Sequence, residues 1–480
     1  MSIRTKGSLA GWDQMLALDL TLMNQIHNFW WKKEHGRKAV TWTYDHTDDG
    51  VIITGQQKEP GTFLPVDRIN DSCFWYAVKL TNGTVQKGNQ KVPIKEWHVQ
   101  FPVKLEKYQL PSSGYNDPEG LIHWGASIKF IRPRDSWDKK MPKFVDSETQ
   151  SPSEGEVIQK LGINSLNIDF WFWPTYDHSP EDAGGLGVIL RLVPSDKVVN
   201  QERFHFGPTS FELQLIYDNG GGLHIPAMVQ NRQGPGTWPA LDGDSLKEDA
   251  GKLGISADLF WNQWFLKYYS YFVFDSQIWP VVPDSYRVGY NPNHPYVDNG
   301  SYRDHYYDFV PNERHHNGVN EPDKTVWTSG TSSADLPGGN RYISQTAWVD
   351  FGYRSEDGID LGGEINAKLD DSGNWQVWWW VASFQVKEMR TNDGSVDIEI
   401  GQIGWAGFNN NSSPDWARKL YSAMGDTVTR TIKSKLGDLI GLKNAHQFWV
   451  PGYENFIAQD PRFLDTRDLV IDMTMNGVPR

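Results

Sequence analysis

Cysteine is almost absent from this sequence of 480 residues, since Cys73 is the single example. One cysteine excludes an intramolecular disulfide, so folding does not depend on an oxidising compartment and can take place in the cytosol. It also excludes zinc sites built from several thiolates. Stability must therefore come from a core, which a chain of this length is large enough to form.

Long hydrophobic runs are also absent. No segment comes near the roughly 18 to 20 uncharged apolar residues that a membrane-spanning helix requires, and mean hydropathy is -0.57. Near the N-terminus, neither an apolar stretch nor a small-residue cleavage site follows Arg4 and Lys6. We expect synthesis in the cytoplasm and, for any release from the cell, a route without a classical signal peptide.

Positive charge is in deficit, with 46 Lys and Arg against 60 Asp and Glu and a formal net charge of -14. A phosphate-binding surface is not expected on such a chain, so nucleic acid is not an expected partner. The sequence also lacks a G-x-x-x-x-G-K-[ST] loop, a G-x-G-x-x-G fingerprint and a G-x-S-x-G elbow. We therefore expect no cofactor and no enzymatic activity.

Histidine gathers in one irregular part of the chain, but without the spacing that places two histidines on one helix face. We interpret this patch as a polar loop and expect no metal site. Its residues are His294, Asp304, His305, Asp308, Glu313, His315 and His316.

Carboxylates on predicted strands could face each other across a groove in a glycosidase. Sequence alone cannot pair any two of them, so solvated strand positions are the simpler interpretation. They are Asp169, Glu212, Glu364 and Glu388.

Aromatic side chains are the residues in excess, with 23 tryptophans. Large rings can fill the wide space between curved sheets, so an aromatic core is the leading interpretation. Platforms that stack on sugars, and an apolar groove or membrane contact, are the alternatives.

Alternating apolar and polar residues predict long strands. The runs 97–105 and 122–130 each place their apolar side chains on one face. The run 375–386 is apolar on both faces and predicts a central strand. Few such runs are separated by helix-length segments, which favours antiparallel hairpins over βαβ crossovers. Further strands are predicted at 166–172, 211–217, 361–369, 396–400 and 469–475.

Three helices are predicted. Asp19 can cap the first, whose apolar residues follow helical spacing through Leu22, Met23, Ile26, Phe29 and Trp30. The second begins near Ser256 and is apolar nearly all round. The third, 416–442, carries a winding apolar stripe, which suits a helix enclosed by a curved sheet. The sequence therefore predicts an α+β, β-dominated fold of long curved antiparallel strands around amphipathic helices.

The N-terminal residues resemble those of a known family. Gly11, Trp12 and Asp13, followed by a short apolar strand and a helix with Asn24, resemble the start of the OrfX family and its sister proteins, which are encoded beside botulinum-type neurotoxins. The C-terminal order of a long helix, a polar excursion and a last strand at 468–475 is also similar. The resemblance implies an elongated tubular lipid-binding (TULIP) architecture, in which a curved sheet wraps a long helix and leaves an apolar channel.

On this basis we expect a TULIP-like N-terminal half at 1–240, an aromatic helix and irregular insertion at 241–340, and C-terminal strands with a long wrapped helix and a final strand at 341–480. The resemblance implies binding of a lipid or another apolar ligand. The expected lining residues of the channel are Trp124, Ile128, Phe170, Phe172, Trp379, Val428 and Ile432.

Three other functions stay open. The family's association with toxins implies an accessory or insecticidal component, whose partner would be a toxin or accessory protein encoded nearby. A pore-former would place its aromatic helix at the bilayer interface. A protein that binds or hydrolyses polysaccharides would use tryptophan platforms. The expected membrane-contact residues are Phe260, Trp261, Trp264 and Phe265.

Overall fold

A computed structural model gives the fold of the chain. The residues that it describes are 9, 11–35, 39–46, 50–65, 73–110, 120–130, 143–145, 152–163, 185–198, 206–216, 221–235, 251–265, 310–316, 319–328, 332–336, 341–351, 358–368, 375–386, 398–406, 456–464 and 467–475.

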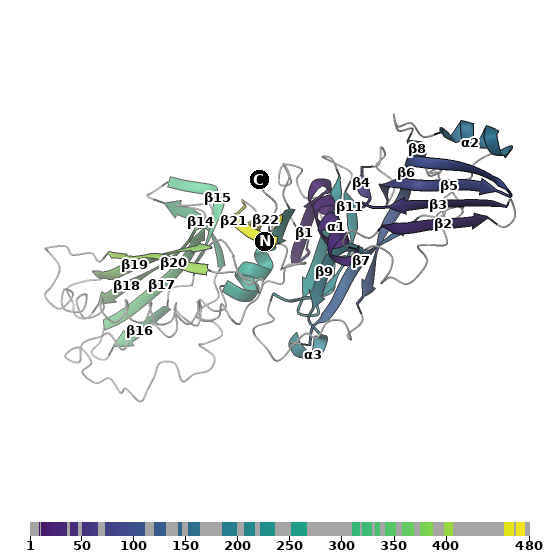
Figure 1. Ribbon diagram of the computed structural model, residues 1–480. Helices are drawn as coiled ribbons and strands as arrows, with labels where there is room; N and C mark the ends of the chain where they lie inside the picture. The colour runs from purple at the N-terminus through teal and green to yellow at the C-terminus, as the bar shows by residue number, and fades with distance from the viewer. Residues whose placement is uncertain are drawn as a thin grey trace.

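These residues form three antiparallel sheets, A, B and C, that follow one another along an elongated molecule (Figure 1). Sheet A lies between the other two and has the order β10 (Pro208–Phe211), β12 (Gly222–Val229), β1 (Gln14–Asp19), β13 (Gly251–Ile255), β22 (Leu469–Met475) and β21 (Phe456–Phe463), with β11 (Gln214–Ile216) beside β12.

Sheet B has the order β2 (Val40–His46), β3 (Val51–Gln57), β5 (Phe74–Lys87), β6 (Gln90–Gln109), β7 (Ile122–Phe130) and β9 (Gly185–Leu192), with β4 (Thr62–Leu64) beside β5 and β8 (Lys143–Val145) beside β6. Sheet C has the order β14 (Val310–His316), β15 (Val319–Thr328), β17 (Arg341–Phe351), β18 (Gly358–Lys368), β19 (Trp375–Val386) and β20 (Ile398–Ala406), with β16 (Ser332–Leu336) beside β17.

The predicted fold class is confirmed, because the chain is a strand-dominated α+β protein with antiparallel pairing throughout the three sheets. Strands β7, β19 and β22 have the predicted bounds, and β19 lies between β18 and β20 as a strand apolar on both faces should. The run predicted at 211–217 is divided between β10 and β11. The strand predicted at 166–172 lies outside the described residues.

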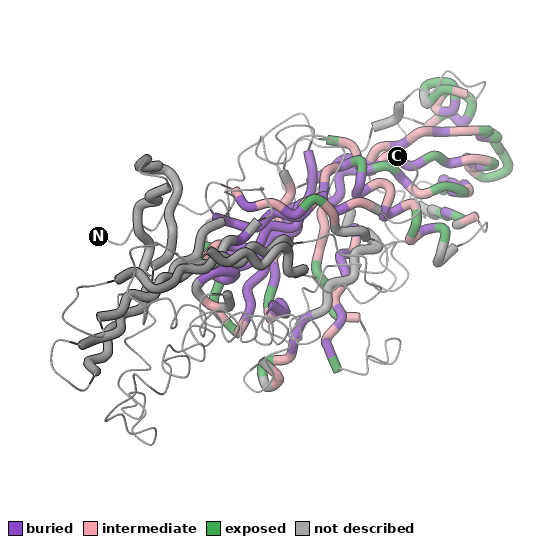
Figure 2. Tube along the Cα trace, turned by 90° about the vertical axis from the view of Figure 1, so that its left-hand side faces the viewer, coloured by how far each residue is buried: buried purple, intermediate pink, exposed green. Residues whose placement is uncertain are grey.

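Sheet A joins distant parts of the sequence. Strands β1, β13 and β22 come from the first, second and third predicted parts of the chain, yet they are neighbours in this sheet. Every residue of β12 is buried, and so is every residue of β1 except Asp19. Figure 2 shows the buried residues concentrated in this central region. The predicted part boundaries at 240 and 340 stay predictions.

Helix α1 (Leu20–His35) begins where predicted, because the Asp19 carboxylate accepts a hydrogen bond from the Leu22 amide at 2.6 Å. Leu22, Met23 and Ile26 are buried. Phe29, one of the apolar positions used to predict the helix, is exposed. The apolar stripe is therefore narrower than the sequence indicated.

Aromatic rings hold α1 against sheet B. The ring of His27 lies 5.4 Å from that of Phe63, and its Nε2 atom is hydrogen-bonded to the Tyr76 hydroxyl at 2.9 Å. The same hydroxyl accepts the amide hydrogen of Gly61 at 3.0 Å. This part of the aromatic excess is core, in agreement with the leading interpretation.

Three short helices complete the described chain. They are α2 (Glu154–Leu161), α3 (Ser195–Val198) and the π-helix η5 (Asp258–Phe265). The second predicted helix corresponds to η5, and its first turn is held by the Ser256 hydroxyl, which accepts the Leu259 amide at 3.2 Å. The third predicted helix, 416–442, lies outside the described residues. Among the described helices, none is long and apolar enough to span a bilayer.

Candidate functional site

The junction between sheets A and B contains two of the predicted lining residues. Trp124 and Ile128 lie four positions apart on β7, so their side chains share one face of the strand. The Trp124 ring packs edge-on against Phe211 of β10, with centroids 6.0 Å apart, and Ile128 is buried. This face of β7 is therefore turned toward sheet A.

Lys107 of β6 fixes the same junction. Lys107 pairs with Ala126 of β7. Its Nζ atom donates one hydrogen bond to the Phe211 carbonyl and another to a Glu212 carboxylate oxygen, both at 2.9 Å. The ammonium group also lies 5.3 Å from the centroid of the Phe211 ring. The Lys107 ammonium group of sheet B thus contacts the backbone and ring of Phe211 and the carboxylate of Glu212. These contacts link sheet B to sheet A at this point.

Glu212 was one of the four carboxylates considered for glycoside hydrolysis. In the structure its carboxylate forms an ion pair with Lys107, which gives it a role in joining the sheets. Glu364 lies on β18, while Asp169 and Glu388 lie outside the described residues. Within the described ranges, no group of three or more His, Cys, Asp or Glu side chains could hold a metal ion.

The other predicted lining residues are elsewhere. Trp379 is in β19 of sheet C, where its backbone pairs with Glu364 and Ala406. The remaining four, Phe170, Phe172, Val428 and Ile432, lie outside the described residues. The structure thus brings Trp124 and Ile128 onto one face, and a channel lined by all seven stays a prediction.

An apolar wall extends from the junction across sheet A. Leu16 of β1 lies opposite Ile225 and Leu253, and Leu253 lies opposite Ile471 of β22, so one row crosses four strands. These side chains are buried. Since residues directly opposite each other share a face, the row is continuous.

Helix α1 covers this wall closely at Gly251. A Cβ atom at that position would lie only 2.6 Å from the Cδ2 atom of Leu22, so a larger residue would force the Leu22 side chain to shift. The face of sheet A that carries Leu16 is therefore the α1 face, and Phe211 lies on it because it pairs with Ala227, two residues along β12 from Ile225.

Two of the four expected membrane-contact residues, Phe260 and Trp261, form part of a packed cluster. Phe260 and Trp261 are fully buried, and their ring centroids lie 5.3 and 5.1 Å from that of Phe463 in β21. The Trp261 indole donates to the Arg467 carbonyl at 2.9 Å. In this packing neither ring reaches the surface, so contact with a bilayer would require η5 to leave its place. Membrane contact by Phe260, Trp261, Trp264 and Phe265 stays a prediction.

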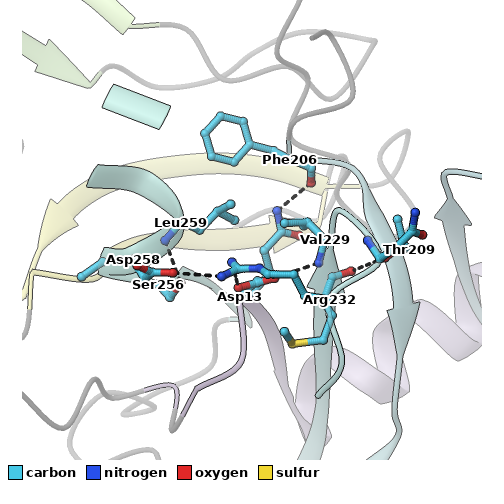
Figure 3. A network of polar contacts seen from close by, with 12 residues as sticks. Asp13, Phe206, Thr209, Val229, Arg232, Ser256, Asp258 and Leu259 are labelled. Atoms are coloured by element: carbon cyan, nitrogen blue, oxygen red, sulfur yellow. Dashed lines mark hydrogen bonds and ion pairs between the residues drawn. The ribbon is translucent and has the colours of Figure 1, made fainter. Parts of the chain in front are cut away.

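An ion-pair network built on the buried carboxylate of Asp13 lies beside this cluster (Figure 3). Asp13 is 2% exposed; its carboxylate accepts the Val229 amide at 2.9 Å and binds the guanidinium of Arg232 through Nε and Nη2. Arg232 also donates through Nη1 to the Asp258 carboxylate at 2.9 Å, at the start of η5. The network therefore joins the beginning of β1, the end of β12 and η5.

Burial dominates the charge state of Asp13. Loss of solvation raises its pKa from 3.8 to about 6, although the Val229 amide and Arg232 both act to lower it. Sequence analysis identified Asp13 only as part of a family motif, and nothing local indicated that its partner is Arg232, 219 positions away. Its role in this structure is to hold elements together.

The other motif residues are structural as well. Asn24 of α1 donates to the Phe63 carbonyl at 3.0 Å and accepts the Phe63 amide at 2.7 Å, so its side chain pairs with β4 as a neighbouring strand would. Trp12 belongs to a buried cluster with Leu9, Met15 and Met228. Trp12 thus packs beside β1 in sheet A, and Asn24 connects α1 to β4 of sheet B.

Three residues, one in sheet B and two in sheet A, carry buried polar atoms that are unpartnered among the described residues. The Trp124 indole nitrogen, the Gln214 side-chain oxygen and both ring nitrogens of His224 lack a hydrogen-bond partner among the described residues. Such groups are uncommon in native structures and each requires an explanation. Sequence reasoning singled out Trp124 for its apolar face and did not identify Gln214 or His224.

Fold and site together define an elongated, β-dominated α+β protein with an apolar interior at the junction of two sheets. The chain is similar to P47 of Clostridium botulinum E1, with 12% identity over 97% of this chain and 99% of that one and a TM-score of 0.47. P47 from Clostridium botulinum A2 gives 12% identity over 99% of each chain and a TM-score of 0.45.

A lipopolysaccharide binding protein is also similar, with 10% identity over 98% of this chain and 100% of that one and a TM-score of 0.34. With TM-scores below 0.5, these similarities carry no statement about what this chain binds. No protein-family model matches the sequence, and no curated protein sequence matches it.

Proposed function

We propose that the protein binds a lipid or another apolar ligand, without catalysing a reaction on it, at the junction of sheets A and B. The observation that carries this proposal is the environment of Trp124. Its ring packs on Phe211, on the same face of β7 as buried Ala126 and Ile128, while its indole N–H is buried without a partner among the described residues.

An apolar environment with one unpaired donor fits a particular class of ligand. Leaving a buried donor unpaired costs roughly 1 to 3 kcal/mol, so the free protein gains from a molecule that supplies an acceptor. A ligand with an apolar chain and an ester or carbonyl oxygen would cover Ile128 and Phe211 and accept the indole hydrogen. Acyl lipids have this combination.

The apolar wall of sheet A supports the same function. It begins beside Phe211 and continues through the row of Leu16, Ile225, Leu253 and Ile471, so an acyl chain leaving the junction would meet apolar side chains. Helix α1 packs over this wall at Gly251. A chain would therefore extend beside α1.

The test is native mass spectrometry of the purified protein, followed by organic extraction and repeated after incubation with liposomes. We expect stoichiometric acyl lipid. Trp124→Phe keeps an aromatic ring and removes the N–H, so lipid retention should fall by about three- to tenfold, the effect of one hydrogen bond. Trp97→Phe is the matched control, since that indole already donates to the Pro152 carbonyl.

A second variant separates an open interior from a packed one. Ala126→Leu adds volume on the face shared by Trp124 and Ile128. Loss of lipid with retained stability is the expected result, whereas a large loss of stability would indicate a packed core. A wild-type protein that stays free of lipid after incubation with liposomes would overturn the proposal.

The accessory or insecticidal role, through protein contacts or membrane interaction, rests on the sequence resemblance alone. Co-purification with the product of a neighbouring gene would be the observation in its favour.

A further inference from the structure

Gln214 and His224 lie on the face of sheet A opposite α1. The residues pair directly across β11 and β12, which places their Cβ atoms about 5 Å apart on one face. The apolar row through Ile225 lies on the other face, because successive residues of a strand alternate. The two side chains therefore form a separate site from the Trp124 junction.

The residues beside His224 on its own strand and directly across from it in β1 supply no hydrogen-bond partner to its ring. The residue across from it in β1 is Ala17, and the nearest residues on the same face of β12 are Gly222 and Pro226. None of these three has a polar side chain, and two of them are small. The sheet therefore surrounds the imidazole without supplying a partner.

The imidazole is nevertheless buried. His224 is 3% exposed, and neither of its ring nitrogens is paired with any described group. The side-chain oxygen of Gln214 is buried and unpaired as well. Two residues that pair across neighbouring strands thus carry three unpaired polar atoms between them, whereas a single isolated unpaired group would account for one.

The hydrogen-bonding properties of these atoms determine which kind of ligand group can bind them. Burial lowers the pKa of His224 to about 4, so the ring is neutral and offers one donor and one acceptor. The Gln214 oxygen only accepts. A group that both donates and accepts can bridge the two, whereas an ionised carboxylate would meet the acceptor oxygen and a ring without charge.

We propose that Gln214 and His224 bind an uncharged hydroxyl group of a ligand. The hydroxyl accepts from the protonated ring nitrogen of His224 and donates to the Gln214 oxygen. An alcohol-bearing lipid and a free polyol share this chemistry. Since the pair lies on the other face of sheet A from Trp124, the inference does not depend on the proposed function.

Isothermal titration calorimetry of the full chain with 1-octanol, glycerol and octanoate tests the inference. We expect 1-octanol or glycerol to bind to the wild type. His224→Phe and Gln214→Leu should each weaken that binding by about tenfold. Octanoate should bind more weakly than the neutral probes. Binding of 1-octanol alone identifies a lipid alcohol, and binding of glycerol alone identifies a polyol. His98→Phe, at a partly exposed histidine of sheet B, is the matched control and should bind as the wild type does.

Gln214→Leu keeps the test informative if His224→Phe fails to fold, because Gln214 lies on the short strand β11 and is only partly buried. No binding of either neutral probe, or equal binding by wild type and variants, would overturn the inference. A high-resolution crystal structure with a single water between the two side chains, unchanged by soaking with either neutral probe, would overturn it as well.

Discussion

Replacing Asp13 by Asn tests whether burial or the ion pair with Arg232 has the larger effect on the pKa of the Asp13 carboxyl group. The folded protein raises the pKa of Asp13 from 3.8 to about 6, chiefly through loss of solvation. A shift of about two units corresponds to roughly 3 kcal/mol between the two protonation states. In the folded protein the neutral form is thus favoured relative to the unfolded chain.

The sign of the pH dependence follows from this shift. Between about pH 4 and pH 6 the folded state binds a proton at Asp13 that the unfolded state does not, so this carboxyl group stabilises the fold as the pH falls through 6. Asp13→Asn removes the titration. The difference in free energy of unfolding between wild type and variant should therefore change by roughly 2 to 3 kcal/mol, in favour of the wild type, from pH 7.5 to pH 4.

Urea unfolding followed by tryptophan fluorescence at several pH values measures this difference. Asp258→Asn is a useful comparison, because it removes a carboxylate from the same guanidinium at an exposed position. If the wild type instead lost stability relative to Asp13→Asn as the pH fell through 6, the ion pair would outweigh burial and the reasoning would be wrong. Parallel curves would also contradict it.

Two further predictions concern how α1 is held. Asn24→Ala removes both hydrogen bonds to the Phe63 backbone and should lower the free energy of unfolding by about 1 to 3 kcal/mol in urea; an unchanged midpoint would show that water replaces the side chain. Tyr76→Phe leaves the Gly61 amide and His27 without their shared hydroxyl, so a loss of similar size is expected by the same assay, and a variant as stable as wild type would contradict a structural role for that hydroxyl.

Local patterns in the sequence were sufficient for some of the strands and for the start of α1. The bounds of β7 and β22 follow from alternation, and those of β19 follow from a run that is apolar on both faces. Asp19 caps α1 as its position predicted. These features depend on residues within one turn or one strand. The same locality allowed Trp124 and Ile128 to be placed on one face before their surroundings were known.

The candidate sites could be predicted only in part. Phe211 meets Trp124, and Gln214 pairs with His224, because particular strands are neighbours in sheets A and B. Strand order depends on contacts far apart in sequence, which one chain does not reveal. Phe260 illustrates the same limit. A helix that is apolar nearly all round has the same sequence pattern whether it contacts a bilayer or a protein core. In the structure the Phe260 ring is buried.

Long antiparallel strands without disulfides, and a helix capped by Asp19, follow from composition and from interactions between close neighbours along the chain. The pairing of Asp13 with Arg232 and the burial of His224 beside Gln214 follow only from the folded arrangement. Both depend on which distant segments pack together and exclude water. Desolvation, which shifts the pKa of Asp13 and leaves His224 neutral, exists only once that packing has formed.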